Sequence, residues 1–182
     1  IMGAEDKLVS LEYDLFCQVR DSIAAQVVRI QKTAKAIAGV DVFCSLSVVS
    51  TRRNYVKPMI NEKGVIQIKN GRHPVVEQMM RDDMFVANDT FLDNGKNRLS
   101  VITGPNMAGK STYMRQVALI VLMAQLGSFV PAQEADIGIC DRIFTRVGAS
   151  DDLASGQSTF MVEMTEVANI LRNATRNSLL VL

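Results

Sequence analysis

The sequence is short of the residue types that build disulfide frameworks, metal centres and histidine-based catalytic sites. It has no tryptophan, one histidine and three cysteines in 182 residues. Cys17, Cys44 and Cys140 are scattered, odd in number and form no C-x-x-C pair, which argues against a disulfide framework and a zinc site. His73 has no second histidine as a co-ligand or catalytic partner, so we interpret it as structural. Reduced cytosolic thiols are the simplest interpretation of the cysteines.

The chain also lacks an excess of charge and a long hydrophobic run. Its formal net charge is +1, with acidic and basic residues mixed along the chain, so direct binding of DNA or an anionic membrane is not expected. The longest apolar run, 117–126, is interrupted by Gln125 and is too short to span a bilayer. No secretory signal is visible at the beginning of the sequence, and a cytoplasmic location is expected.

Apolar residues nevertheless make up 48% of the chain, enough for one domain with an appendage. Residues 4–38 carry apolar side chains at spacings of three or four, which predicts one long helix with a single apolar stripe. Gly39 supplies a stop, and Asp41 can cap a second helix running to about Arg53. Two interpretations stay open: the stripe packs against another part of the protein, or the helices form an ordinary hairpin.

The composition changes near Asn54, where we place the boundary between a helical arm (1–53) and a second domain (54–182). Short β-prone runs follow and alternate with helical patterns. Two of them flank the turn 61–64, and a continuous apolar run at Leu179–Leu182 reads as a buried parallel strand. The further candidates are Phe85–Asn88, Leu99–Thr103, Ala135–Ile139 and Arg142–Val147. This alternation predicts an α/β domain with a mainly parallel sheet and an antiparallel annex.

The most informative stretch runs from Leu99 to Thr112. The β-prone run Leu99–Thr103 is followed by Gly104–Ser111, which fits G-x-x-x-x-G-K-[ST], and then by an apolar helical stretch, 113–126. Strand, glycine-flanked loop and helix are the context that a phosphate-binding P-loop requires. The glycines let the backbone turn its N–H groups toward an anion, and the helix N-terminus adds its positive dipole end. The pattern therefore predicts nucleotide binding.

Four motifs in order support a family resemblance. Thr103–Gln116 resembles the P-loop of the MutS family of DNA mismatch-repair ATPases, and Gly71–Pro74 resembles the segment upstream of it. Asp141–Leu153 and Ser158–Met164 are similar to the family's downstream segments. The resemblance covers residues 71–182 closely and the N-terminal helices less distinctly. It implies a P-loop NTPase fold of the ABC-ATPase type that works as a homodimer, with ATP or ADP and Mg²⁺ as cofactors.

The resemblance also assigns roles to individual residues. Lys110 and Ser158 are the implied catalytic residues, Ser158 reaching the γ-phosphate bound by the other subunit, and Ser111 is the implied Mg²⁺ ligand. Phe85 and Val86 match the segment that packs on adenine, with a core strand as the alternative. For Ser158 the alternative is a simple helix N-cap. The implied cofactor-binding loop comprises Gly104, Pro105, Asn106, Met107, Ala108, Gly109, Lys110, Ser111 and Thr112.

Some parts of the family pattern are absent from this sequence. The Asp-Glu pair expected after the strand Leu179–Leu182 and the mismatch-reading domains expected before Ile1 are not present. We therefore expect the chain to be a fragment that binds ATP or ADP weakly and hydrolyses ATP negligibly by itself. Mismatched DNA and downstream repair factors would be partners of the intact protein. No membrane is expected among its partners. The loop 148–157 is a candidate switch segment.

Three alternatives to this interpretation stay open. The chain could belong to the paralogous MutS2 branch, or it could be another P-loop motor or transporter ATPase. The segment Ser158–Met164 does not look like the transporter signature. A non-hydrolysing, nucleotide-dependent dimerisation module is the remaining alternative.

Overall fold

The computed structural model describes residues 2–80, 84–146 and 159–182. The chain divides into two compact units, residues 1–47 and 48–182. The loop 148–157 and Ser158, which the sequence marks as a switch segment and a catalytic residue, lie outside the described residues.

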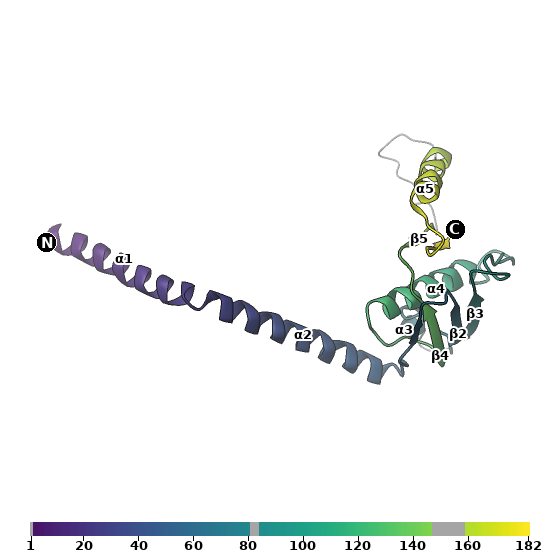
Figure 1. Cartoon of the computed structure of the whole chain (residues 1–182), viewed down its shortest axis with the longest axis horizontal. Helices are drawn as coiled ribbons and strands as arrows, with labels where there is room; N and C mark the ends of the chain where they lie inside the picture. Colours follow the sequence, from purple (N-terminus) through teal and green to yellow (C-terminus); the bar gives the residue numbers. More distant parts are fainter. Residues whose placement is uncertain (1, 81–83, 147–158) are drawn as a thin grey trace. The chain divides into compact units, whose positions relative to one another are not determined.

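The first unit is built from α1 (Met2–Ala24) and most of the next helix, α2 (Val27–Arg52), whose last residues belong to the second unit. They follow one another end to end rather than fold back as a hairpin (Figure 1). The expected stop at Gly39 is wrong, because the interruption lies at residues 25–26, where the Gln26 N–H donates to the Ile23 carbonyl, three residues back, at 2.9 Å. A glycine inside a helix costs only about 1 kcal/mol relative to alanine, too little to end a helix of 26 residues.

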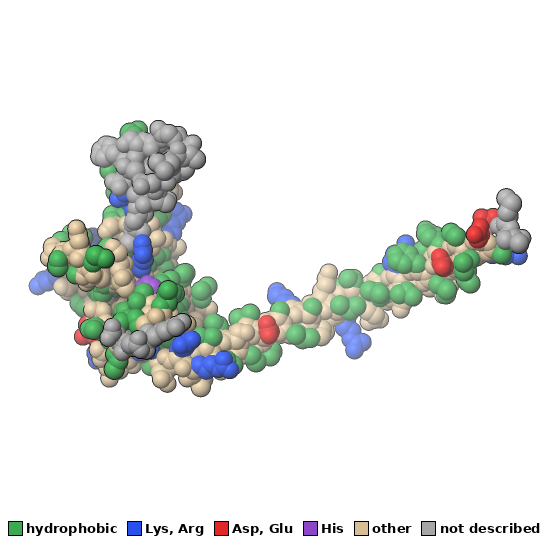
Figure 2. All heavy atoms as spheres, turned by 180° about the vertical axis from the view of Figure 1, so that it is seen from behind, with side chains coloured by type: hydrophobic (Ala, Val, Ile, Leu, Met, Phe, Trp, Pro, Cys, Tyr) green, Lys and Arg blue, Asp and Glu red, His purple; other side chains and the backbone are tan. Residues whose placement is uncertain are grey.

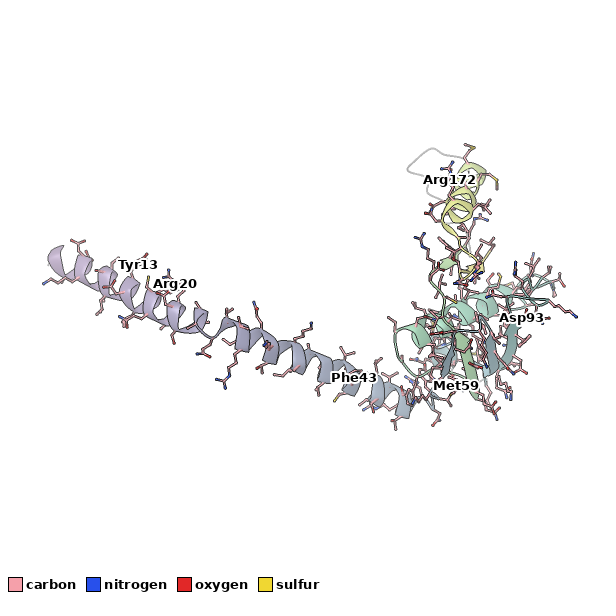
Figure 3. The ribbon with its side chains drawn as sticks, in the orientation of Figure 1. Tyr13, Arg20, Phe43, Met59, Asp93 and Arg172 are labelled. Atoms are coloured by element: carbon pink, nitrogen blue, oxygen red, sulfur yellow. The ribbon has the colours of Figure 1, made fainter. Side chains whose placement is uncertain are left out.

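Hydrophobic side chains along these helices are largely exposed (Figure 2). Tyr13 and Phe43 stand out from the backbone in Figure 3, with 65% and 72% of their surfaces exposed. By length and composition, α2 is apolar enough to cross a membrane, a criterion that core helices of water-soluble proteins also meet. The first unit thus presents apolar surface that its own residues do not cover.

A four-stranded sheet forms the centre of the second unit. Its strands are β1 (Met59–Asn61), β2 (Ile66–Gly71), β3 (Asn88–Leu92) and β4 (Glu134–Gly138), in the order β1-β4-β2-β3. β1 pairs parallel with β4, whereas β2 pairs antiparallel with both β4 and β3. The two strands flanking the turn 61–64 therefore do not pair with each other, because β4 lies between them.

A second sheet contains β5 (Ile143–Thr145) and β6 (Leu179–Val181), which pair parallel. Helix α5 (Thr159–Asn173) precedes β6, and the short helix α3 (Val76–Met79) follows β2. The unit is therefore a mixed α/β structure. Its strand pairings among the described residues are two parallel and two antiparallel.

Helix α4 (Lys110–Gln125) packs on the four-stranded sheet and contacts β2, β5 and β6. Its buried residues include Ile120 and Val121, which join Ile68 of β2 and Ile137 of β4 in one hydrophobic cluster. β2 alternates buried and exposed positions from Ile66 to Lys69, the period expected of a strand with one face in the core. The predicted helix after the P-loop is thus confirmed.

Two predicted strands are not formed as expected. Leu99–Thr103 adopts no strand, and Leu99 and Val101 are 82% and 77% exposed. β-branched composition favours a strand only where a neighbouring strand accepts its hydrogen bonds and side chains, and no described strand pairs with this segment. The run Phe85–Asn88 is likewise displaced, because the strand there begins at Asn88.

A glycine allows the sheet to approach α4 closely. A Cβ on Gly71 would lie 2.9 Å from Gln116 Nε2, 2.9 Å from Ile68 Cγ2 and 3.2 Å from the Asn88 carbonyl oxygen. The Gln116 side chain is fully buried, and neither end of its amide has a hydrogen-bond partner among the described residues. The end of β2 and the second turn of α4 are therefore in direct van der Waals contact at residue 71.

We expect Gly71→Ala to lower the free energy of unfolding by about 1–3 kcal/mol, because the added methyl group overfills a packed contact. Urea denaturation followed by circular dichroism would measure the change. Gly39→Ala is the control: nothing lies within 4 Å of a Cβ there, and the substitution should stabilise α2 by about 0.5–1 kcal/mol. Unchanged stability of the Gly71→Ala chain would contradict the close approach.

Candidate nucleotide-binding site

The loop 104–109 turns sharply and delivers the chain into α4. Gly104 (φ 153°), Met107 (φ 64°) and Gly109 (φ 82°) all have positive φ angles, which glycine adopts at little cost. Gly109 is the N-cap of α4 and makes no side-chain capping bond. The first N–H groups of a helix have no acceptor within it. These donors are therefore open to an external acceptor, and the positive end of the helix dipole points the same way.

The Lys110 side chain folds back over the loop. Its Nζ donates to the carbonyl oxygens of Gly104 and Pro105, each at 2.7 Å. Both acceptors are neutral, whereas an ammonium group bonds more strongly to anionic oxygens. The lysine is thus held at the loop by bonds that a phosphate oxygen can replace.

All the residues predicted for the phosphate site lie together on this loop and the first turn of α4. Residues 103–109 are exposed, Ser111 is exposed and Thr112 is half-buried. Met107 projects into solvent. The site is therefore a shallow, accessible surface of the second unit, with its polar groups on contiguous residues.

The segment predicted to contact adenine precedes β3. Phe85 is half-buried, Val86 is 79% exposed and neither lies in a strand, so the alternative of a core strand is wrong. The Asn88 side-chain amide donates to the Val86 carbonyl at 2.9 Å, which holds the backbone of this segment at the beginning of β3.

Tyr113 connects β3 to the first turns of α4. Its hydroxyl lies 2.9 Å from Thr90 Oγ1 and donates to the Asp89 carbonyl at 3.2 Å. The motif pattern gave Tyr113 no role. The sequence does place a tyrosine directly after Ser111 and Thr112, and the hydroxyl of a partly buried tyrosine usually finds a hydrogen-bond partner.

The segment Gly71–Pro74 places two side chains on backbone groups. His73 is buried, and its Nδ1 accepts the N–H groups of Val75 and Val76 at 3.2 Å each. Burial lowers the pKa of His73 below its ordinary value, because charging the imidazole there would require desolvating it. This geometry agrees with a structural role.

Arg72 contacts the two residues that follow α2. Its Nη2 donates to the carbonyls of Arg53 and Asn54 at 3.1 and 3.3 Å, and its Nε pairs with Glu77 Oε2 at 2.7 Å. A cation at the last carbonyls of a helix also opposes the negative end of its dipole. The glycine, arginine and histidine of this motif thus position α4, α2 and α3 respectively.

A groove of about 760 Å³ opens beside the loop. Leu99 and Ile102 line it together with Tyr113, Cys140 and Leu180. The unpaired segment 99–102 therefore borders open space next to β6. A turn precedes this segment, since Asp93 (Figure 3) accepts the N–H groups of Gly95 and Asn97.

Comparison with known proteins gives consistent matches. Residues 100–182 match the family model of MutS domain V. Over 182 residues the chain is 72% identical to the DNA mismatch repair protein MutS of Lachnoclostridium phytofermentans and 63% identical to that of Acetivibrio thermocellus. Over 181 residues it is 64% identical to the DNA mismatch repair protein MutS of Caldicellulosiruptor saccharolyticus. These matches cover the whole chain but 20–21% of each relative, so the chain spans about a fifth of their length.

The lowered pKa of His73 makes stability depend on pH. Its ordinary pKa is 6.5, so between the lowered and the ordinary value the unfolded chain binds more protons than the folded chain, and acidification favours unfolding. We expect the free energy of unfolding to fall as the pH drops below about 6.5. His73→Asn, which keeps an acceptor oxygen but does not titrate, should flatten this dependence. An identical pH profile for both chains in denaturant titrations would contradict it.

Proposed function

Because the chain belongs to the MutS family of DNA mismatch-repair proteins, we propose that residues 54–182 bind ATP and ADP as part of a P-loop ATPase domain. On this proposal the domain has the ABC-ATPase fold with a mainly parallel sheet, and residues 1–53 are the helical arm leading into it. The parallel pairs β1–β4 and β5–β6 support this fold.

One observation carries the proposal: the uncapped first turn of α4 and the Lys110 ammonium converge on the loop 104–109. The open N–H groups of a helix N-terminus, the helix dipole and a lysine ammonium together form a binding site for a polyphosphate. The residues fit the ligand because the bonds that Lys110 makes within the described part of the chain go to neutral carbonyl oxygens. Asn106, Gly109, Ser111 and Thr112 would complete the contacts to the phosphates and Mg²⁺. Phe85 and Val86 would supply apolar surface to adenine.

Ser111 fits a role as a Mg²⁺ ligand. Its exposed hydroxyl lies directly after Lys110, and Mg²⁺ in nucleotide sites takes one or two protein ligands beside phosphate oxygens and waters. In residues 2–80, 84–146 and 159–182 no three histidine, cysteine, aspartate or glutamate side chains gather as an independent metal site. When bound, Mg²⁺ neutralises phosphate charge.

We extend the proposal to the whole protein through the family. The full-length protein would hydrolyse ATP as a cytoplasmic homodimer, with Lys110 holding the phosphates and Ser158 of one subunit reaching the γ-phosphate on the other. ATP binding would then control how mismatched DNA is clamped and when downstream repair factors engage. The relatives named DNA mismatch repair protein MutS support this extension.

Substituting Lys110 tests the nucleotide site. We expect Lys110→Ala to weaken binding of Mg·ATP about ten- to a hundredfold, the magnitude of a lost charge-assisted contact. Isothermal titration calorimetry on the chain would measure the dissociation constants. The matched control is Lys96→Ala, which removes an exposed lysine from the loop before the site and should leave affinity unchanged. Equal affinities for the Lys110→Ala and original chains would refute the proposed site.

A further inference from the structure

The two parts of the candidate nucleotide site come from separate stretches of the chain. The phosphate loop 104–109 leads into α4, whereas Phe85 and Val86 precede β3. A nucleotide that contacts both parts requires a fixed separation between them. The contacts that fix this separation therefore influence how well a nucleotide with a base binds.

A series of hydrogen bonds joins the two parts. The Asn88 amide donates to the Val86 carbonyl, and Asn88 begins β3. The next two residues, Asp89 and Thr90, contact the Tyr113 hydroxyl at 3.2 and 2.9 Å. Tyr113 itself follows Thr112 of the phosphate site. Because three residues of extended chain span about 10 Å, this hydroxyl restrains Val86 to a short distance from α4.

The link is held at both of its ends. Thr90 is 7% exposed, and a buried hydroxyl without a hydrogen-bond partner is unfavourable; the one partner that the described residues offer its oxygen is Tyr113. On the other side, Asp89 Oδ1 accepts the Asn70 N–H at 2.7 Å, which ties the same end of β3 to β2. Tyr113 therefore connects α4 to a strand end that is already fixed in the sheet.

We propose that Tyr113 is a positioning residue that sets the distance between the phosphate-binding loop and the base-binding segment, and so determines how strongly the base adds to nucleotide affinity. This inference rests on the proposed nucleotide site. A ligand that contacts only the loop is insensitive to the link, whereas a nucleotide that contacts both parts depends on it.

The test compares Mg·ADP with Mg·tripolyphosphate, which carries phosphates but no base. Calorimetry on the full chain with Tyr113→Phe should show ADP binding weakened about three- to tenfold, the range of one hydrogen bond, with tripolyphosphate binding unchanged. A purely structural role would alter both ligands together. Thr90→Val should reproduce the ADP effect, and the double variant should add little to either single one because both remove the same contact.

Tyr13→Phe removes a tyrosine hydroxyl from the first unit, where Tyr13 is 65% exposed, and is the matched control, with no expected change in the affinity for either ligand. Thermal unfolding verifies that each variant is folded. If the Tyr113→Phe chain is not folded, Thr90→Val is used to compare ADP with tripolyphosphate binding. An equal loss of affinity for both ligands, or no loss of affinity for ADP, overturns the inference but leaves the proposed site intact. Failure of the original chain to bind either ligand overturns the proposed function, and the inference with it.

Discussion

The burial of one face of α4 is the constraint on which the rest of the second unit depends. Ile120 and Val121 are fully buried against Ile68 and Ile137 of the sheet, and each such side chain contributes about 1.5–3 kcal/mol when removed from water. The glycine-flanked loop is continuous with the N-terminus of this helix. The packing that stabilises the unit therefore also determines where the open N–H groups of the helix point.

Apolar burial fixes the direction of α4, whereas polar contacts fix its register against neighbouring segments. Gly71 admits the Gln116 side chain at the end of β2, and Tyr113 binds the beginning of β3. Burial alone is non-directional and would tolerate small shifts of the helix. Hydrogen bonds and a close steric contact do not, because both depend on distances within a few tenths of an ångström. The position of the loop 104–109 thus depends on residues outside the Gly104–Ser111 motif.

The sequence predicted the elements that depend on local patterns. It missed the features that depend on contacts between residues far apart in the chain. The loop, α4 and the strands at 134–138, 143–145 and 179–181 follow from motif spacing and short-range patterns. Insertion of β4 between β1 and β2 joins residues 65 to 77 positions apart, and no local pattern encodes such a pairing. Leu99–Thr103 has strand composition but no described partner, and the interruption at residues 25–26 has neither glycine nor proline to mark it. The contacts of Tyr113 and Gly71 are invisible until the segments are brought together.

The Arg72 side chain binds three groups at once. Its guanidinium is a rigid plane that bonds the carbonyls at the end of α2 and the Glu77 carboxylate together, so these bonds cannot be adjusted independently. Arg72 therefore ties the residues that follow α2 to α3, which contains Glu77. Gly71 abuts Gln116 of α4. The carbonyls that follow α2 are thereby joined to α4 through one side chain and one steric contact, at the consecutive residues Arg72 and Gly71.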